Sequence, residues 1–321
     1  MELQIINNHQ YNKTEEVSSP FIEANTLPMT LNEIRSQHLI PVFVKDNQPT
    51  ISQADFISTA TEIVEEISGR PTTHPKIRVS HPIKGRTFEA RNKKASELED
   101  REKTIYYERM AFVSEIPSCK EIVHGQELTL SFGGIKAYNQ DNLNNYGGNI
   151  QRFKFFIGFK VKVCTNLCIW TDGFTGELKV RNLAELTDRI YELINSYQSD
   201  AQIKSLKKLG DYELTEKQFA KFLGRARMYN HLPKALKSNI PQLLISDSQV
   251  SAMTKAYYTD DHFSRTLDGN INLWNLYNLL TGSLKTSYIN TFLDRGVNAH
   301  LLTNGLSEAL EGRGDYRWFM D

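Results

Sequence analysis

The segment RFKFFIGFKVKV, residues 152–163, is the strongest strand signal in the chain. Its odd-numbered positions are all apolar, whereas four of its even-numbered positions are cations. Because successive side chains of a strand point to opposite faces, one face of this strand must pack against a core. The segment GELKVR, residues 176–181, repeats the alternation after a turn bracketed by Gly173 and Gly176, which predicts a β-hairpin.

If these two strands pair, six cations surround one aromatic ring on a single sheet face. Successive side chains on such a face are about 6.6 Å apart, a spacing that resembles that of phosphates in an extended single strand. No acid lies among the four cations, although a merely solvated face usually pairs its charges across strands. We therefore predict a face that binds single-stranded nucleic acid and stacks bases on its aromatic ring. The predicted site residues are Arg152, Lys154, Phe156, Lys160, Lys162, Lys179 and Arg181.

The alternative for this face is a solvated surface without a ligand. Exposed sheets commonly carry lysines, which also protect strand edges from aggregation.

Strand patterns lie mainly in the first half of the chain and helix patterns in the second half. Because this segregation is typical of α+β proteins, we predict an α+β fold with an antiparallel sheet in the first half and a helical second half. Residues 1–29 are polar and are expected to form a flexible N-terminal arm. Residues 30–199 are predicted to form an α+β domain with the antiparallel sheet, and residues 200–321 a helical region packed on it.

Local signals place the ends of several elements. Thr30 opens a capping box and predicts a helix over 31–37. Ser52 precedes an apolar helical periodicity that closes at Gly69, and Thr215 is a further predicted N-cap. The double glycine in FGGIKAYN is expected to mark a turn or a bulge. Further strands are expected over 39–44, 111–116 and 127–132.

For two segments the sequence allows two predictions each. The charged stretch KKASELEDREKTIYYER, residues 93–109, is expected to be either a helix or a mobile excursion. The asparagine-rich stretch 138–149 is long for a loop, so it is expected to be either functional or disordered.

The net charge of the chain is zero, with 38 basic and 38 acidic residues, which excludes a uniformly basic polyanion-binding protein. The charges are nevertheless segregated along the sequence. Residues 70–110 hold 11 cations and 6 anions, and residues 200–240 hold 9 and 4, whereas residues 1–69 hold 3 and 10. Either the acidic region packs on a basic one, or a basic surface is left open for a polyanion.

The three cysteines are too few for a disulfide framework and favour a reducing, cytoplasmic location. Cys164 and Cys168 are predicted to be buried thiols rather than zinc ligands. The N-terminus lacks the pattern of a signal peptide. No run reaches the roughly 18 apolar residues of a membrane span, so no membrane partner is predicted.

The chain contains no Walker pattern and no GxGxxG, so we predict no cofactor. We also predict no metal site. The nearest candidate is Asp260, Asp261 and His262 in YYTDDHF, where carboxylates beside a histidine would suit a metal-dependent phosphodiester hydrolase. The other interpretation is that the carboxylates cap the next turn.

Four segments carry a resemblance to a known family: FGGIKAYN, VKVCTNLCIWTDG, the helix that begins RNLAEL, and WNLYNLLTGSLKTSYI. Together they resemble domain-of-unknown-function family 3871, uncharacterised proteins of Bacteroidetes. Family 932, a broader group of phage- and plasmid-like proteins, is distantly similar through the V-C-T-N strand at 163–166 and the W-x-L-Y-N-x-L-T helix at 274–281. The resemblance implies a mobile-element setting with contact to DNA, and it transfers no catalytic residues.

Three functions follow as hypotheses. The first is a non-enzymatic protein of a mobile element that binds DNA or RNA through the basic sheet face. The second is the metal-dependent phosphodiester hydrolase. The third is a structural module without catalysis that forms a homo-oligomer.

Overall fold

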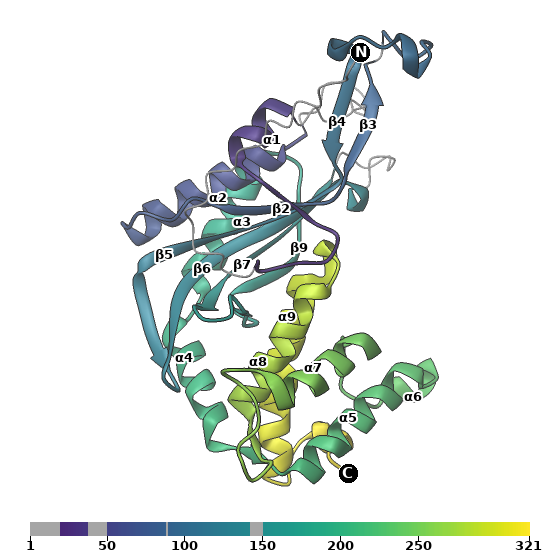
Figure 1. The fold of residues 1–321 in the computed structure, drawn as a ribbon. Coiled ribbons are helices and arrows are strands. Elements are labelled where there is room, and N and C mark those ends of the chain that lie inside the picture. The colour runs from purple at the N-terminus through teal and green to yellow at the C-terminus, as the bar shows by residue number, and fades with distance from the viewer. Residues whose placement is uncertain (1–19, 38–49, 88, 142–149) are drawn as a thin grey trace, which may run out of the picture.

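The computed structural model describes residues 20–37, 50–87, 89–141 and 150–321, and Figure 1 shows their arrangement. Strands dominate the first half and helices the second, which confirms the predicted α+β fold. Within these residues, seven strands form one antiparallel sheet in the order β1–β2–β5–β6–β7–β8, and β9 also pairs with β7. The strands are β1 Leu27–Met29, β2 Lys76–Val79, β5 Arg109–Val123, β6 Gln126–Ala137, β7 Gln151–Val161, β8 Leu167–Cys168 and β9 Phe174–Val180.

The alternating segment forms β7, which is covered on both faces. Phe153 and Phe155 are buried in a core that also contains residues of the helices α2 (Gln53–Ser68) and α3 (Leu183–Ser196). On the opposite face Phe156 is buried in a second, larger core built mainly from the helical half of the chain. The prediction that one face meets a core is confirmed, but the opposite face is not open to solvent as predicted.

The predicted antiparallel pairing of the two strands is confirmed, because Arg152 of β7 lies opposite Lys179 of β9 and Phe153 opposite Leu178. The predicted turn was wrong, since β8 lies between the two strands in sequence and Gly176 lies inside β9. The expectation that the double glycine marks a turn or bulge was wrong, since Gly133 and Gly134 lie inside β6. The reason is close packing on both faces of the sheet. A Cβ at Gly133 would lie 2.0 Å from the backbone oxygen of Phe112, and a Cβ at Gly134 would lie 2.5 Å from the ring of Phe56.

The helices of the first half begin where the capping signals placed them. Helix α1 spans Leu31–Gln37, and the backbone N–H of Thr30 donates to Glu33 at 2.7 Å. Helix α2 begins after Ser52, which forms a capping box with Asp55, and it ends at Gly69 in the left-handed conformation. The predicted strand over 39–44 lies outside the described residues.

The expected flexible arm is described only from residue 20 onward, and this part is anchored to the fold. Phe21 and Ile22 are buried in the core of the helical half. Strand β1 pairs with β2 at the edge of the sheet. The described part of the arm is therefore a piece of the folded domain, because its few apolar residues find partners that are distant in sequence.

The charged stretch over 93–109 forms no α-helix. Short 3-10 turns over Ala95–Glu97 and Asp100–Glu102 lead into β4, Lys103–Tyr107, which pairs with β3, Pro82–Arg86, in a separate two-stranded sheet. The hairpin extends away from the main sheet (Figure 1). Ion pairs within it, such as Lys93 with Glu102, compensate part of its charge locally.

The second half forms the predicted helical region. Thr215 caps its helix through a capping box with Gln218, as predicted. None of the helices in the described ranges is both long and apolar enough to cross a membrane. The elements of this half are α4 Ser199–Lys208, β10 Glu213–Leu214, α5 Glu216–His231, α6 Lys234–Lys237, α7 Asp247–Thr259, β11 Ile271–Asn272, α8 Leu273–Ser283 and α9 Ile289–Leu310.

Two fully buried side chains form an ion pair inside the fold. Lys136 on β6 is fully buried, and its Nζ lies 2.7 Å from Oδ2 of Asp141. The ammonium also lies 4.1 Å from the ring centre of Phe153, and Oδ1 of Asp141 accepts from the backbone N–H of Arg152 at 2.8 Å. Burial lowers the pKa of Lys136 to about 8, although Asp141 opposes the shift. The pair therefore fixes the end of β6 to the start of β7.

Candidate polyanion-binding surface

The predicted basic face of the sheet carries its own carboxylates. Lys154 pairs with Asp294 on α9, and Lys160 pairs with Glu115 on β5 and is almost completely buried. The remaining pairs are Arg152 with Glu177 at 2.7 Å, Lys179 with Glu177 at 3.1 Å and Lys162 with Glu127 at 3.3 Å. Arg181 is exposed at the end of β9.

The predicted stacking platform is not accessible. Phe156 has no exposed surface, because the helical half packs over this face of β7. The prediction of an open, acid-free face with an exposed aromatic ring was therefore wrong. Its acids come from other strands and from α9, so they are absent from the local sequence of β7.

The other residues that the sequence suggested as catalytic or metal-binding groups have structural roles. Oδ1 of Asp260 accepts from the backbone N–H groups of His262 and Phe263 at 2.9 and 2.8 Å, so this carboxylate caps the turn after α7. Cys168 is buried, and burial raises the pKa of the half-buried Cys164 thiol to about 11. No group of three or more possible metal ligands occurs in the part of the chain that the structure describes.

Two segments that carry the family resemblance meet in the fold. The side-chain amide of Asn166 donates to the backbone oxygen of Asn278 at 2.9 Å, which joins the turn after β7 to α8. Lys285 donates to the hydroxyl of Thr165 at 3.1 Å and to the backbone oxygen of Cys164. Cys164, Asn166, Asn278 and Lys285 are among the residues that line a cavity of about 310 Å³. The segments thus hold the sheet and the helical half together.

A different basic surface lies on α5 and α6. We define the α5–α6 basic surface by six cations within residues 217–237, a stretch that contains no acid. Helix α5 buries Phe219, Phe222, Ala226 and Tyr229, whose spacing turns the opposite side toward solvent. The six cations are Lys217, Lys221, Arg225, Arg227, Lys234 and Lys237.

The cations are regularly spaced along the solvent side of α5. Lys217, Lys221 and Arg225 follow one another at intervals of four residues, which places them about 6 Å apart along the helix axis. Lys217, Lys221 and Arg227 are exposed, whereas Arg225 is half-buried. Gly224 lies between Lys221 and Arg225 in the sequence. A Cβ at this position would contact nothing within 4 Å, so the surface is open there.

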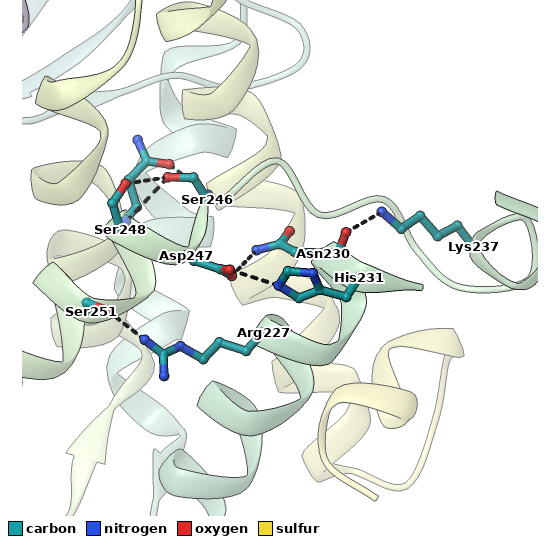
Figure 2. Close-up of polar contacts among 9 residues, drawn as sticks. Arg227, Asn230, His231, Lys237, Ser246, Asp247, Ser248 and Ser251 are labelled. Carbon is teal, nitrogen blue, oxygen red and sulfur yellow. Dashed lines mark hydrogen bonds and ion pairs between the residues drawn. The ribbon is translucent and has the colours of Figure 1, made fainter. Parts of the chain in front are cut away.

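The interactions of these cations are with neutral groups. Arg227 donates to the hydroxyl of Ser251 at 2.9 Å, and Lys237 donates to the backbone oxygen of Asn230 at 3.2 Å (Figure 2). The guanidinium of Arg225 lies 5.0 Å from the ring centre of Trp318. Among the residues that the structure describes, none of the six cations forms an ion pair. Their positive charge is therefore uncompensated by direct contact.

Two described carboxylates lie at the borders of this surface: Glu216, in the first turn of α5 beside Lys217, and Asp247, which is held by neighbouring side chains. Asp247, in the first turn of α7, accepts from Asn230 at 2.8 Å and contacts Nε2 of His231 at 2.9 Å (Figure 2). These hydrogen bonds lower the pKa of Asp247, so it is ionised at neutral pH. The contacts tie the end of α5 to the start of α7, and they fix the orientation of the basic helix.

The sequence signal for this surface was the excess of cations over residues 200–240. This signal identifies no individual site residues, because a charge block shows neither which residues face outward nor which acids fold onto them.

Comparison with known proteins identifies a family. A family model described as "Domain of unknown function, B. Theta Gene description (DUF3871)" matches residues 3–320. No curated protein and no solved structure matches the chain.

Proposed function

We propose that this chain, which belongs to the DUF3871 family, binds the phosphate backbone of nucleic acid through the α5–α6 basic surface. The proposal is supported by a difference between two sets of cations in the same chain, those predicted on the sheet and those on α5 and α6. Five of the six cations predicted on the sheet pair with carboxylates, whereas none of the six described cations on α5 and α6 does so. A polyanion gains most from charges that have no intramolecular partner, because no existing ion pair must be broken.

The proposed contact is with phosphates rather than with bases. The aromatic rings next to the surface, Tyr229 and Trp318, already contact Lys237 and Arg225, and Tyr229 is buried. Flexible lysine and arginine side chains on a helix suit phosphate oxygens without reading sequence. Binding is therefore proposed to be independent of nucleotide sequence. Single-stranded nucleic acid, which the amino-acid sequence led us to expect, and duplex are the two ligands to compare.

The biological setting belongs to the same proposal. We propose the setting that the sequence resemblance implies, a protein of a phage- or plasmid-type mobile element in Bacteroidetes. A cytoplasmic location, favoured by the sparse cysteines, would give such a protein access to nucleic acid.

The proposal is tested by measuring the affinity of the wild-type chain for fluorescent oligonucleotides over a series of salt concentrations. If all six cations contact phosphates, the log–log slope of affinity against salt is about −4 for a single strand and about −5 for a duplex. Oligonucleotides of equal length but different sequence are expected to bind alike. Absence of binding at low salt, or affinity independent of salt, would overturn the proposal.

A further inference from the structure

Strand β9 forms an edge of the main sheet. Among the described residues it pairs only with β7, and its side chains Glu177 and Lys179 are exposed. A groove of about 500 Å³ runs beside it, lined by both β9 and α3, with Leu178 and Leu193 among its lining residues. An exposed edge beside a groove is the arrangement in which another strand can be added to a sheet.

The charges of β9 match those of a second β9 strand running antiparallel to it. Glu177 and Lys179 lie on either side of Leu178. In a two-fold pairing centred on Leu178, Glu177 stands directly opposite Lys179 of the partner subunit, and the reverse pair forms as well. Opposite charges on directly opposed positions stabilise antiparallel strands. An edge that carries only lysines would instead repel its own copy.

The existing contacts of these side chains do not prevent this pairing. Glu177 contacts Arg152 and Lys179 within the chain, at 2.7 and 3.1 Å, but it is half exposed in these pairs. Such exposed ion pairs are weak and exchange readily with new partners.

We propose that β9 is a homodimer interface, in which two copies of this chain pair their β9 strands about a two-fold axis at Leu178 and join their sheets into one. This inference is independent of the proposed nucleic-acid binding, since α5 and α6 contribute nothing to it. It commits to a second copy of this chain because the strand is complementary to itself in charge and direction.

The test is sedimentation velocity on the full chain and on two single variants. Wild type is expected to self-associate reversibly to a dimer. Lys179→Glu places two glutamates opposite each other, and Glu177→Lys places two lysines opposite each other, so each variant is expected to dimerise at least about tenfold more weakly. When the two variants are mixed, opposite charges face each other again, and a heterodimer is expected.

The mixing step separates a lost interface from a damaged fold, because a misfolded variant cannot be rescued by another variant. Lys162→Glu, which changes an exposed cation in the turn after β7, is the matched control and is expected to dimerise like wild type. Three results would each overturn the proposal: a wild-type monomer at the highest concentration the protein tolerates, unchanged dimerisation of both single variants, or a mixture that stays monomeric.

Discussion

Replacing Lys217, Lys221, Arg227 and Lys234 by glutamine is expected to weaken binding of a single-stranded oligonucleotide several hundred-fold at about 0.1 M salt. The estimate follows from counterion release. Each phosphate contact contributes about 0.7 to the log–log slope for a single strand, so four lost contacts remove about 2.8 from the slope. All four side chains are exposed, so the substitutions are expected to leave the fold intact. Fluorescence anisotropy over a salt series measures both the affinity and the slope.

The matched control changes the net charge equally at four cations that are engaged in ion pairs. These are Lys103, Lys120, Lys162 and Arg189, whose partners are Asp100, Glu127, Glu127 and Glu192. Their replacement by glutamine is expected to leave affinity within a few-fold of wild type. An equal loss in both variants would mean that total charge, rather than the α5–α6 basic surface, determines binding.

Replacing Lys136 by methionine is expected to destabilise the fold by about 3–5 kcal/mol, because it leaves the carboxylate of Asp141 buried without its cation. The ammonium of Lys136 is fully buried and lies between Asp141 and the ring of Phe153. Denaturant-induced unfolding, followed by circular dichroism, measures the change in the free energy of unfolding.

Restoring the charge balance should recover most of this loss. In the double variant Lys136→Met with Asp141→Asn, no charge is buried. The side-chain oxygen at position 141 can still accept from the N–H of Arg152. Replacing a buried ion pair by neutral groups is often close to neutral for stability. A double variant as unstable as Lys136→Met alone would show that the loss comes from packing rather than from an unpaired charge.

Much of the secondary structure could be predicted because its signals are local. The capping boxes at Ser52 and Thr215 involve residues three positions apart, and both helices begin there. The alternating pattern of β7 and its pairing with β9 could be predicted for the same reason. The glycines of β6 were misread, because the close approach of Phe112 and Phe56 that requires them arises only in the folded sheet.

The expectation of an open, acid-free sheet face was wrong for the same reason. The absence of acids within residues 152–162 was a correct observation, but Asp294 lies 140 positions from Lys154 and Glu115 lies 45 positions from Lys160. The sequence alone could not show that these carboxylates fold onto the strand. The charge block on α5 and α6 was visible, because its cations follow one another along the sequence over residues 217–237 without an intervening acid. The tertiary structure determines that these six cations have no carboxylate partner among the described residues.

Binding of nucleic acid at the α5–α6 basic surface is measured most directly by a lysine-modification footprint. The chain is acetylated with and without a saturating oligonucleotide, and the modified sites are quantified by mass spectrometry. We expect Lys217, Lys221 and Lys234 to be protected by the oligonucleotide, while Lys103, Lys120 and Lys162 react as before. Protection of the second group without the first, or no protection of either, would contradict binding at this surface.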